Sequence, residues 1–361
     1  MGYQPDLIQV NRPGYFARTS QSILANQSDA TLQAYFMWKA IKRLAPWVGA
    51  EVTNRFTLRQ SVGSIYSGNP EACIAALDRG PWTQSVLAPD LSTMSWALSR
   101  FYVERSFPPG AQNTTTVVVR NVQRFLVQKI QQSRWLSDAV KRIATGRINS
   151  VKWTLGFDDK LIDPLLSQKR MSGLTISDSN IGNALELSRM DIARLWTTLT
   201  NPSDGVVRNN MSPMTVDAQY LPVAHEIYVP AGMAEAVSRE PVPAFAAYGY
   251  FGTLVGHEIG HIIDGRPPTM QGWDKTSVGA MQERIACIEK QYSNFTFMAG
   301  NGATTHVQGK TTGVENMADQ HGLSASYAAW KDLQRSPDTR DLELPGLELF
   351  SSDQLFFLNC K

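Results

Sequence analysis

The sequence predicts a mainly helical protein with a small β-sheet, which is an α+β fold. Apolar residues recur at helical spacing in several segments before residue 200. A short segment around residue 227 has the β-branched and aromatic residues of a strand, and a long apolar segment follows residue 243. A chain of 361 residues is long enough for two or three domains. Because the sequence changes character near Asn201, we expect one lobe over residues 1–200 and a second over residues 201–361.

Four helices are predicted in the first lobe from apolar residues that repeat every three or four positions. Asp29 caps the first, and Pro46 ends it because proline lacks the N–H that a helix interior needs. The second follows residues 114–116, Ser137 opens the third, and the fourth spans residues 180–199. We interpret the four stripes as core faces. Their members are, in order, Leu32, Tyr35, Phe36 and Leu44, then Val118, Val122, Phe125, Leu126 and Ile130, then Val140, Ile143, Ala144 and Ile148, and finally Ile181, Leu185, Ile192 and Leu195.

The second lobe opens with a turn cluster, NPSDG, at residues 201–205. Ile227, Tyr228 and Val229 predict a short strand, and Pro230 after them favours an edge position, where a missing N–H is tolerated. From Pro243 to residue 263 the residues are almost all apolar, which predicts a helix buried on most sides.

The charge pattern excludes several classes of partner. Lys and Arg total 34 and Asp and Glu total 32, so the net charge is +2, and no run of five basic residues occurs. We therefore expect neither a nucleic-acid surface nor a polybasic membrane patch. No stretch approaches 18 consecutive apolar residues, and the first ten residues lack the basic and apolar regions of a signal peptide. Contact of this chain with a membrane is not expected.

Three titratable residues interrupt the apolar helix, namely His257, Glu258 and His261. Burying such groups without partners is costly, so a core helix has no structural use for them. Positions four apart lie on one face of a helix about 6 Å apart, so both imidazoles can reach one metal ion. Glu258 lies beside them and can act on water as a general base.

A catalytic zinc ion needs a third protein ligand. Asp264 is too close in sequence to fold back easily as that ligand, and Glu283 and Glu289 fit the solvated face of an amphipathic helix. Glu315 and Asp319 are again four residues apart. Glu315 could complete the site while Asp319 accepts the free ring N–H of a ligand histidine.

The segments GHEIGHIIDGR (256–266) and VENMADQHGL (314–323) resemble the neprilysin and endothelin-converting-enzyme family of zinc endopeptidases. The likeness extends to DAQYLPVAHEIYVPAGM (217–233), CIEKQYSNF (287–295), LPGLELFSSDQLFFLN (344–359) and, in the first half, ALSRFYVERSF (97–107). The resemblance implies a thermolysin-like zinc lobe plus a helical lobe. It also implies a peptide substrate and an extracellular or secretory-pathway location.

The resemblance assigns roles residue by residue. It implies one zinc ion per chain held by His257, His261 and Glu315, with Glu258 as general base and Asp319 as the partner of His257. Substrate binding is carried over to Asp217, Ala218 and Tyr220. The implied function is a zinc metalloendopeptidase that hydrolyses oligopeptides with a metal-activated water.

Three departures from the family pattern support an alternative to an active endopeptidase. Asp217 stands where the family has Asn, and an ionised carboxylate accepts hydrogen bonds without donating them. The turn after His261 is shorter, and the chain stops at Lys361, before a family segment that carries a histidine and an arginine of the active site. The alternative is a catalytically impaired or inactive truncated homologue that binds zinc or peptide without efficient turnover.

Overall fold

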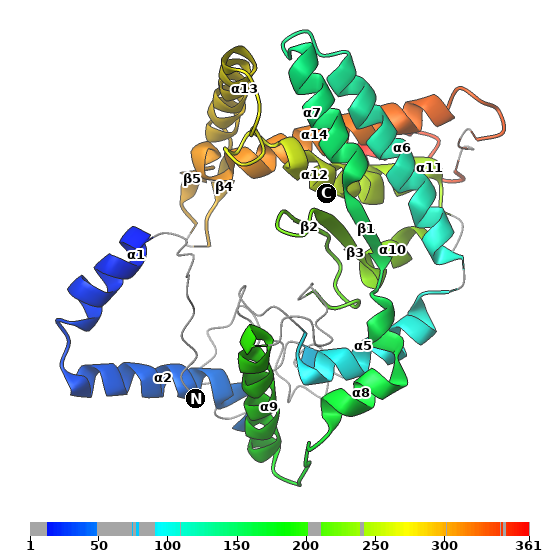
Figure 1. The fold of residues 1–361 in the computed structure, drawn as a ribbon. Coiled ribbons are helices and arrows are strands. Elements are labelled where there is room, and N and C mark those ends of the chain that lie inside the picture. The colour runs from blue at the N-terminus through cyan, green and yellow to red at the C-terminus, as the bar shows by residue number, and fades with distance from the viewer. Residues whose placement is uncertain are drawn as a thin grey trace. The chain divides into compact units, whose positions relative to one another are not determined.

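The computed structural model describes residues 13–48, 74, 77–78, 91–108, 110–200, 211–238, 242–300, 302–339, 341 and 344–360. Its helices and small sheets confirm the predicted fold class (Figure 1). Contacts divide the chain into unit 1, Met1–Arg100 with Asp159–Ser212, and unit 2, Phe101–Asp158 with Pro213–Lys361. The predicted lobes, residues 1–200 and 201–361, are contiguous instead. The differences are residues 101–158, which belong to unit 2, and residues 201–212, which belong to unit 1.

Unit 1 is built from helices. They are α1 (Pro13–Arg18), the π-helix η1 (Thr19–Leu24), α2 (Asp29–Val48), the start of α5 (Thr93–Ser106), the 3-10 helix η2 (Asp159–Ile162), α8 (Pro164–Met171) and α9 (Asn180–Thr200). Asp29 is the first residue of α2 and not its cap, because Ser28 accepts the N–H of Thr31, and the helix continues through Pro46 to Val48. Asp163 caps α8 by accepting hydrogen bonds from two backbone N–H groups, and Pro164 takes the first helical position, where no N–H is needed.

Two predicted core stripes of unit 1 are wrong. In α2, Tyr35 is 50% and Phe36 is 59% exposed. In α9, all four predicted residues are exposed, and the helix instead buries Ala184, Leu187 and Ser188. The small residues on that face allow close approach, so which apolar stripe faces a neighbour depends on packing partners that periodicity cannot reveal. The turn cluster predicted at residues 201–205 lies outside the described residues.

Unit 2 contains a three-stranded sheet. The central strand β3 (Glu226–Pro230) pairs in parallel with β1 (Lys152–Gly156) and antiparallel with β2 (Gln219–Leu221). The predicted strand is therefore present, but its predicted edge position is wrong. Pro230 is its last residue and lies opposite Gly156, so the missing N–H falls where the ladder ends. A second sheet pairs β4 (Thr296–Met298) with β5 (Thr304–His306).

Helices make up most of the rest of unit 2, and several of them pack against the three-stranded sheet (Figure 1). They are α6 (Ala111–Gln131), α7 (Asp138–Ser150), α10 (Ala231–Ser238), α11 (Ala244–Ala247), η3 (Tyr248–Gly252), α12 (Thr253–Gly260), η4 (His261–Ile263), α13 (Lys275–Ser293), α14 (Gly309–Leu333) and α15 (Ser352–Leu358). Ser137 caps α7 as predicted, since its side chain accepts the N–H of Val140. The predicted stripes of α6 and α7 are confirmed by burial of Val118, Val122, Leu126, Ile130, Val140, Ala144 and Ile148.

The predicted apolar helix is confirmed as one helical stretch over Ala244–Ile263. Its successive parts are α11, the π-helix η3, α12 and the 3-10 helix η4. Phe251, Val255 and Ile259 are fully buried in the main core of unit 2. Buried apolar residues precede and follow His257, Glu258 and His261 in this stretch. Their packing holds the backbone of these three titratable residues in place.

Helices α12 and α14 pack backbone against backbone. A Cβ built on Gly256 would lie 2.7 Å from Cα of Gly322, and one built on Gly322 would lie 2.5 Å from the backbone N of His257. One turn away, a Cβ on Gly260 would lie 3.0 Å from Cα of Ala318. The contacts step by four residues in opposite directions on the two helices, so the helices run antiparallel. Only glycine leaves enough room for this approach.

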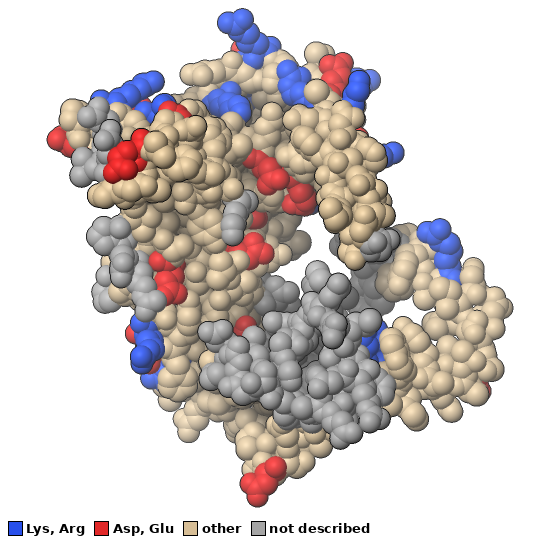
Figure 2. Space-filling model, turned by 180° about the vertical axis from the view of Figure 1, so that it is seen from behind, with Lys and Arg blue, Asp and Glu red and all other residues tan. Residues whose placement is uncertain are grey.

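Two further features concern the surface. Among the described residues, no helix has both the length and the apolar character needed to cross a membrane. On the face drawn in Figure 2, the coloured Lys and Arg side chains of the described chain stand apart from one another and form no continuous basic area.

We predict that Gly322→Ala lowers the free energy of unfolding by about 1–3 kcal/mol, the usual cost of overpacking. The added methyl group would meet the backbone of α12, which cannot rotate away as a side chain can. Gly279→Ala is the matched control, because that helical glycine has nothing within 4 Å of its Cβ position. The control should gain about 0.5–1 kcal/mol. Urea unfolding followed by circular dichroism compares the two, and equal stabilities would contradict the close approach.

Candidate active site

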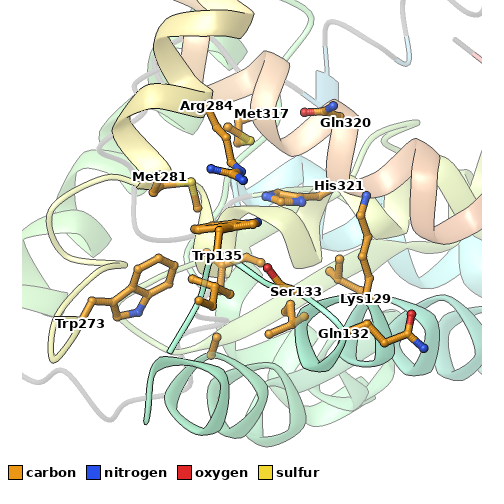
Figure 3. A pocket seen from close by; sticks show the side chains of 15 residues that line it. Lys129, Gln132, Ser133, Trp135, Trp273, Met281, Arg284, Met317, Gln320 and His321 are labelled. Carbon is orange, nitrogen blue, oxygen red and sulfur yellow. The ribbon is translucent and has the colours of Figure 1, made fainter. Parts of the chain in front are cut away.

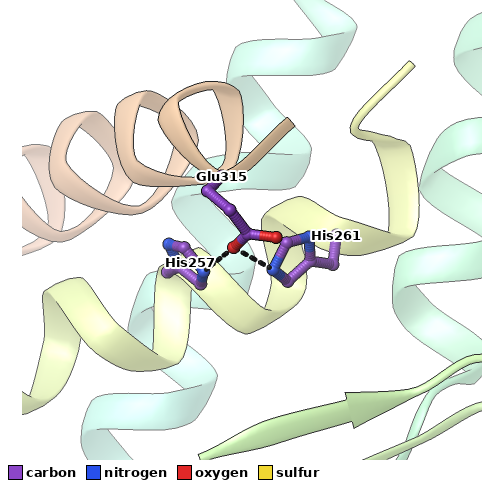
Figure 4. Close-up of side chains that lie close together, drawn as sticks. All are labelled: His257, His261 and Glu315. Carbon is purple, nitrogen blue, oxygen red and sulfur yellow. Dashed lines mark ion pairs between the residues drawn. The ribbon is translucent and has the colours of Figure 1, made fainter. Parts of the chain in front are cut away.

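Three predicted site residues come together from two helical segments of unit 2 (Figure 4). His257 lies on α12, His261 begins η4, and Glu315 lies on α14. Glu315 Oε2 lies 3.3 Å from Nε2 of His257 and 3.3 Å from Nε2 of His261. The two imidazole rings are nearly perpendicular, with centroids 4.6 Å apart. The helical i, i+4 spacing and the antiparallel contact with α14 therefore place three potential ligand atoms around one point.

The two distances from the Glu315 oxygen to the imidazoles fit a tetrahedral metal ion. Bonds of about 2.0–2.1 Å would separate two ligand atoms by about 3.3 Å, which matches both distances to Glu315. Each Nδ1 is hydrogen-bonded to a carboxylate, 2.7 Å to Asp319 Oδ1 and 3.1 Å to Asp264 Oδ2. These bonds assign the ring protons to Nδ1 and leave the Nε2 lone pairs facing the Glu315 oxygen. Three electron pairs that converge in this way favour a bound cation.

The electrostatic field at His257 favours positive charge. Burial disfavours the protonated imidazole, but the hydrogen bond to Asp319 acts in the opposite direction and is reinforced by nearby carboxylates, including Glu258 and Glu315. The pKa of His257 is therefore raised above its usual value. A site that stabilises a proton in this position also stabilises a metal cation.

Glu258 lies beside the group but is more deeply buried, with 5% of its surface exposed. Its Oε2 accepts the backbone N–H of Tyr220 on β2 at 2.6 Å. Burial raises the pKa of Glu258 to about 7, although the two imidazoles and the Tyr220 N–H pull it down. A carboxyl group with a pKa near the working pH is suited to transferring protons.

The predicted substrate residues lie next to Glu258. Asp217 is exposed, and its Oδ1 accepts the N–H of Ala218 at 2.8 Å. Tyr220 lies on β2, the edge strand, and its hydroxyl is 2.9 Å from Nδ1 of His225. The edge strand near the motif is therefore β2, one strand away from the one that the sequence suggested.

Asp264 is a site residue whose role the sequence analysis missed. It was dismissed as a metal ligand, and the structure makes it the hydrogen-bond partner of His261 instead. It is fully buried, it also accepts hydrogen bonds from Arg266 N and Thr269 Oγ1, and it lies 2.5 Å from the Arg266 guanidinium. Burial opposes its ionisation, but the bonds from His261 and Arg266 outweigh that effect and lower its pKa. Its position three residues after His261 was the available signal.

The sequence favours surface or turn positions for the other three histidines, which match no residue of the family pattern, and the structure gives them different surroundings. His225 has a φ of 49° in the turn between β2 and β3, and His306 is exposed on β5. The expectation is wrong for His321, which lies within α14 with a buried Nε2 that has no hydrogen-bond partner. Burial lowers the pKa of His321 to about 4. Its place on α14 turns it away from solvent, which sequence neighbours alone do not indicate.

Known proteins resemble this chain over nearly its whole length. Two sequence profiles of Peptidase family M13 match it, one over residues 2–158 and the other over residues 217–360. An endothelin-converting enzyme homolog of Locusta migratoria is 27% identical over 98% of this chain and 48% of the relative. Neprilysin-3 of Drosophila melanogaster is 26% identical over 98% of this chain and 44% of the relative. The chain therefore spans about half the length of the curated relatives it matches.

Solved structures share the fold. A zinc metalloprotease of Mycobacterium tuberculosis, solved with an inhibitor, has a TM-score of 0.71 and 23% identity, covering 96% of this chain and 50% of that one. PepO of Lactobacillus rhamnosis has a TM-score of 0.58 and 20% identity, covering 74% of this chain and 40% of that one. At such identities the likeness concerns the fold alone.

We predict that Asp264→Asn lowers the free energy of unfolding of the metal-free protein at pH 7 by about 1.5–3 kcal/mol, the usual worth of hydrogen bonds to a charged group. Because the pKa of Asp264 is depressed in the folded protein, its contribution is present above the unfolded value of about 3.9 and is lost as the pH falls further. The difference from wild type should therefore shrink at pH 3. Urea unfolding at both pH values measures it.

The control for this experiment is Asp138→Asn, because the Asp138 side chain is 86% exposed. An exposed ion pair of this kind contributes about 0–1 kcal/mol. If Asp138→Asn costs as much stability as Asp264→Asn, the buried network around Asp264 does not stabilise the fold.

Proposed function

The chain belongs to Peptidase family M13, and from this premise we propose that it is a zinc-dependent metalloendopeptidase that hydrolyses peptide bonds of oligopeptides. The observation that carries the proposal is the convergence of two imidazole Nε2 atoms and one carboxylate oxygen, with Glu258 beside them. Metal ligands and a general base in this arrangement suit hydrolysis by an activated water.

We assign one zinc ion per chain to His257, His261 and Glu315. Asp319 and Asp264 would orient the two imidazoles, because each accepts the ring N–H that does not face the metal. When bound, zinc supplies a Lewis acid that polarises a peptide carbonyl and lowers the pKa of water. Two histidines and one carboxylate also leave a fourth position open for this chemistry.

Glu258 is assigned as the general base. Its Oε2 is held by the Tyr220 N–H, while Oε1 makes no hydrogen bond within the described part of the chain. We assign Oε1 to take the proton from the attacking water and to pass it to the leaving amine. Burial supports this role, because a carboxylate shielded from bulk solvent has its pKa raised toward neutrality.

Substrate is proposed to lie along β2. Its outer edge is free of strand pairing within the described chain, and Ala218 and Tyr220 bring that edge next to Glu258. An extended peptide can add to such an edge through main-chain hydrogen bonds. An extracellular or secretory-pathway location is proposed from family membership.

One observation favours the impaired alternative. Asp217 adds negative charge near Glu258 and helps to raise its pKa, and its own Oδ1 is already bonded to the Ala218 N–H. A carboxylate there cannot donate a hydrogen bond to a substrate carbonyl. The alternative is a homologue that binds zinc or peptide without efficient turnover.

His261→Ala is expected to abolish stoichiometric zinc binding, because it removes one of three ligands. Asp319→Ala should keep the ligands but weaken zinc affinity by about 10–100-fold, since His257 loses the acceptor that orients it. Elemental analysis and competition with a chelator measure the two effects. His306→Ala, on the exposed strand β5, is the matched control and should bind zinc as wild type does. Full zinc retention by His261→Ala would place the metal elsewhere.

Glu258→Gln should retain zinc and lose peptide cleavage by at least about 100-fold, because an amide keeps the shape but cannot accept the proton. Turnover of a quenched fluorescent peptide by the zinc-loaded chain measures the rate. Glu283→Gln, at an exposed position of α13, is the control and should cleave normally. Equal rates in the Glu258 and Glu283 variants remove Glu258 from the mechanism. Zinc-loaded wild type without turnover supports the impaired alternative.

A further inference from the structure

Unit 2 contains a cavity of about 440 Å³ that lies apart from the candidate metal group (Figure 3). It is bounded by the end of α6 and the residues that follow it, and by α7, η4, α13 and α14. None of His257, His261 and Glu315 lines it. Its volume falls in the range of about 300–1,000 Å³ that is typical of small-molecule sites.

The walls of this cavity are largely apolar and aromatic. Met281 and Met317 are almost fully buried, and Figure 3 shows Trp135 at the centre of the lining side chains with Trp273 to one side. Leu126, Ile130 and Leu136 complete the apolar lining. Such a surface suits a ligand with a hydrocarbon or aromatic body, which would be removed from water on binding.

Three polar side-chain atoms that belong to lining residues of this cavity are buried, with almost no accessible surface, and have no hydrogen-bond partner. They are Ser133 Oγ, Trp273 Nε1 and His321 Nε2. A buried polar group left unpaired costs about 1–3 kcal/mol, so native proteins seldom keep several of them together. The concentration of unpaired atoms here points to a polar ligand group that satisfies them.

The charge of the lining indicates the sign of that ligand. Arg284 and Lys129 are cationic, and no Asp or Glu lines the cavity. The Arg284 guanidinium stacks over Trp135 at 4.1 Å from the ring centroid and donates to the carbonyl of Ala280. Lys129 Nζ donates to Ser324 Oγ at 2.5 Å. Neither cation forms an ion pair within the described chain, so both are available to an anion.

We propose that this cavity binds a small amphipathic carboxylate, with its apolar body between the Trp and Met side chains and its carboxylate at Arg284. The Trp273 N–H and the Ser133 hydroxyl are donors that a carboxylate can accept from, and Arg284 offers the charge-assisted bonds that such a group prefers. The site is independent of the proposed peptidase chemistry, because it shares no lining residue with the metal group.

The test uses 3-phenylpropionate and indole-3-propionate as probes and isothermal titration calorimetry on the whole, metal-free chain at pH 7. Both acids should bind, and the neutral analogue 3-phenylpropionamide should bind at least about 10-fold more weakly, because it cannot pair with a guanidinium. Arg284→Met should weaken binding of the acids by about 10-fold or more while leaving the amide unchanged. Trp273→Phe keeps an aromatic side chain but replaces the indole by a phenyl ring and so removes the N–H, and should weaken binding of the acids by about 3–10-fold.

Arg142→Met, at an exposed position of α7, is the matched control and should bind the acids as wild type does. Circular dichroism of each variant establishes that it is folded, and Trp273→Phe keeps the test valid if Arg284→Met does not fold. The proposal is overturned if the acids do not bind below about 10 mM, if acid and amide bind equally, or if neither cavity variant weakens the acid. No peptide is present, so failure here leaves the peptidase proposal untouched.

Discussion

The contact between α12 and α14 is the constraint on which the candidate site depends. At Gly256 and Gly322 the two backbones touch, and no side chain can be accommodated between them. This approach brings Glu315 to 3.3 Å from both imidazoles, although Glu315 lies more than 50 residues beyond His261 in sequence. The positions of Asp319 and of the cavity wall at Met317 and His321 follow from the same contact, because they lie on successive turns of α14.

The site gathers several carboxylates around the two imidazoles. Asp264, Glu258, Glu315 and Asp319 all lie near the two imidazoles, and the first two are buried. Their effects on pKa differ with their partners. Asp264 is surrounded by donors and has a lowered pKa, whereas Glu258 has one backbone donor and has a raised pKa. Two acids in one site are thus separated into an orienting carboxylate and a group able to exchange a proton, which is how environment divides such roles.

The sequence was informative wherever a pattern is local. The helical stripes of α6 and α7, the Ser137 cap and the apolar stretch over residues 244–263 all follow from spacing, and the structure contains them. Sequence patterns gave wrong predictions where burial or strand order depends on a neighbouring segment. The stripe of α9 is exposed, and β3 is central because β1, more than 70 residues earlier, pairs with it in parallel. A proline at the end of a strand is compatible with either an edge or a central position of that strand in the sheet.

By itself, the sequence determined the residue types and spacings of the candidate site. Two histidines lie four residues apart on an apolar helix, and two acidic residues lie four apart on another. The helical repeat places each pair on one face of its helix. Only the tertiary structure decided which faces meet. It made Asp264 a partner of His261, brought the Tyr220 N–H to Glu258, and enclosed His321 beside two tryptophans. The physical reason is that hydrogen bonds and cavities form between segments distant in sequence, and their geometry is set by the close packing of helices whose contact residues carry no chemical signal of their own.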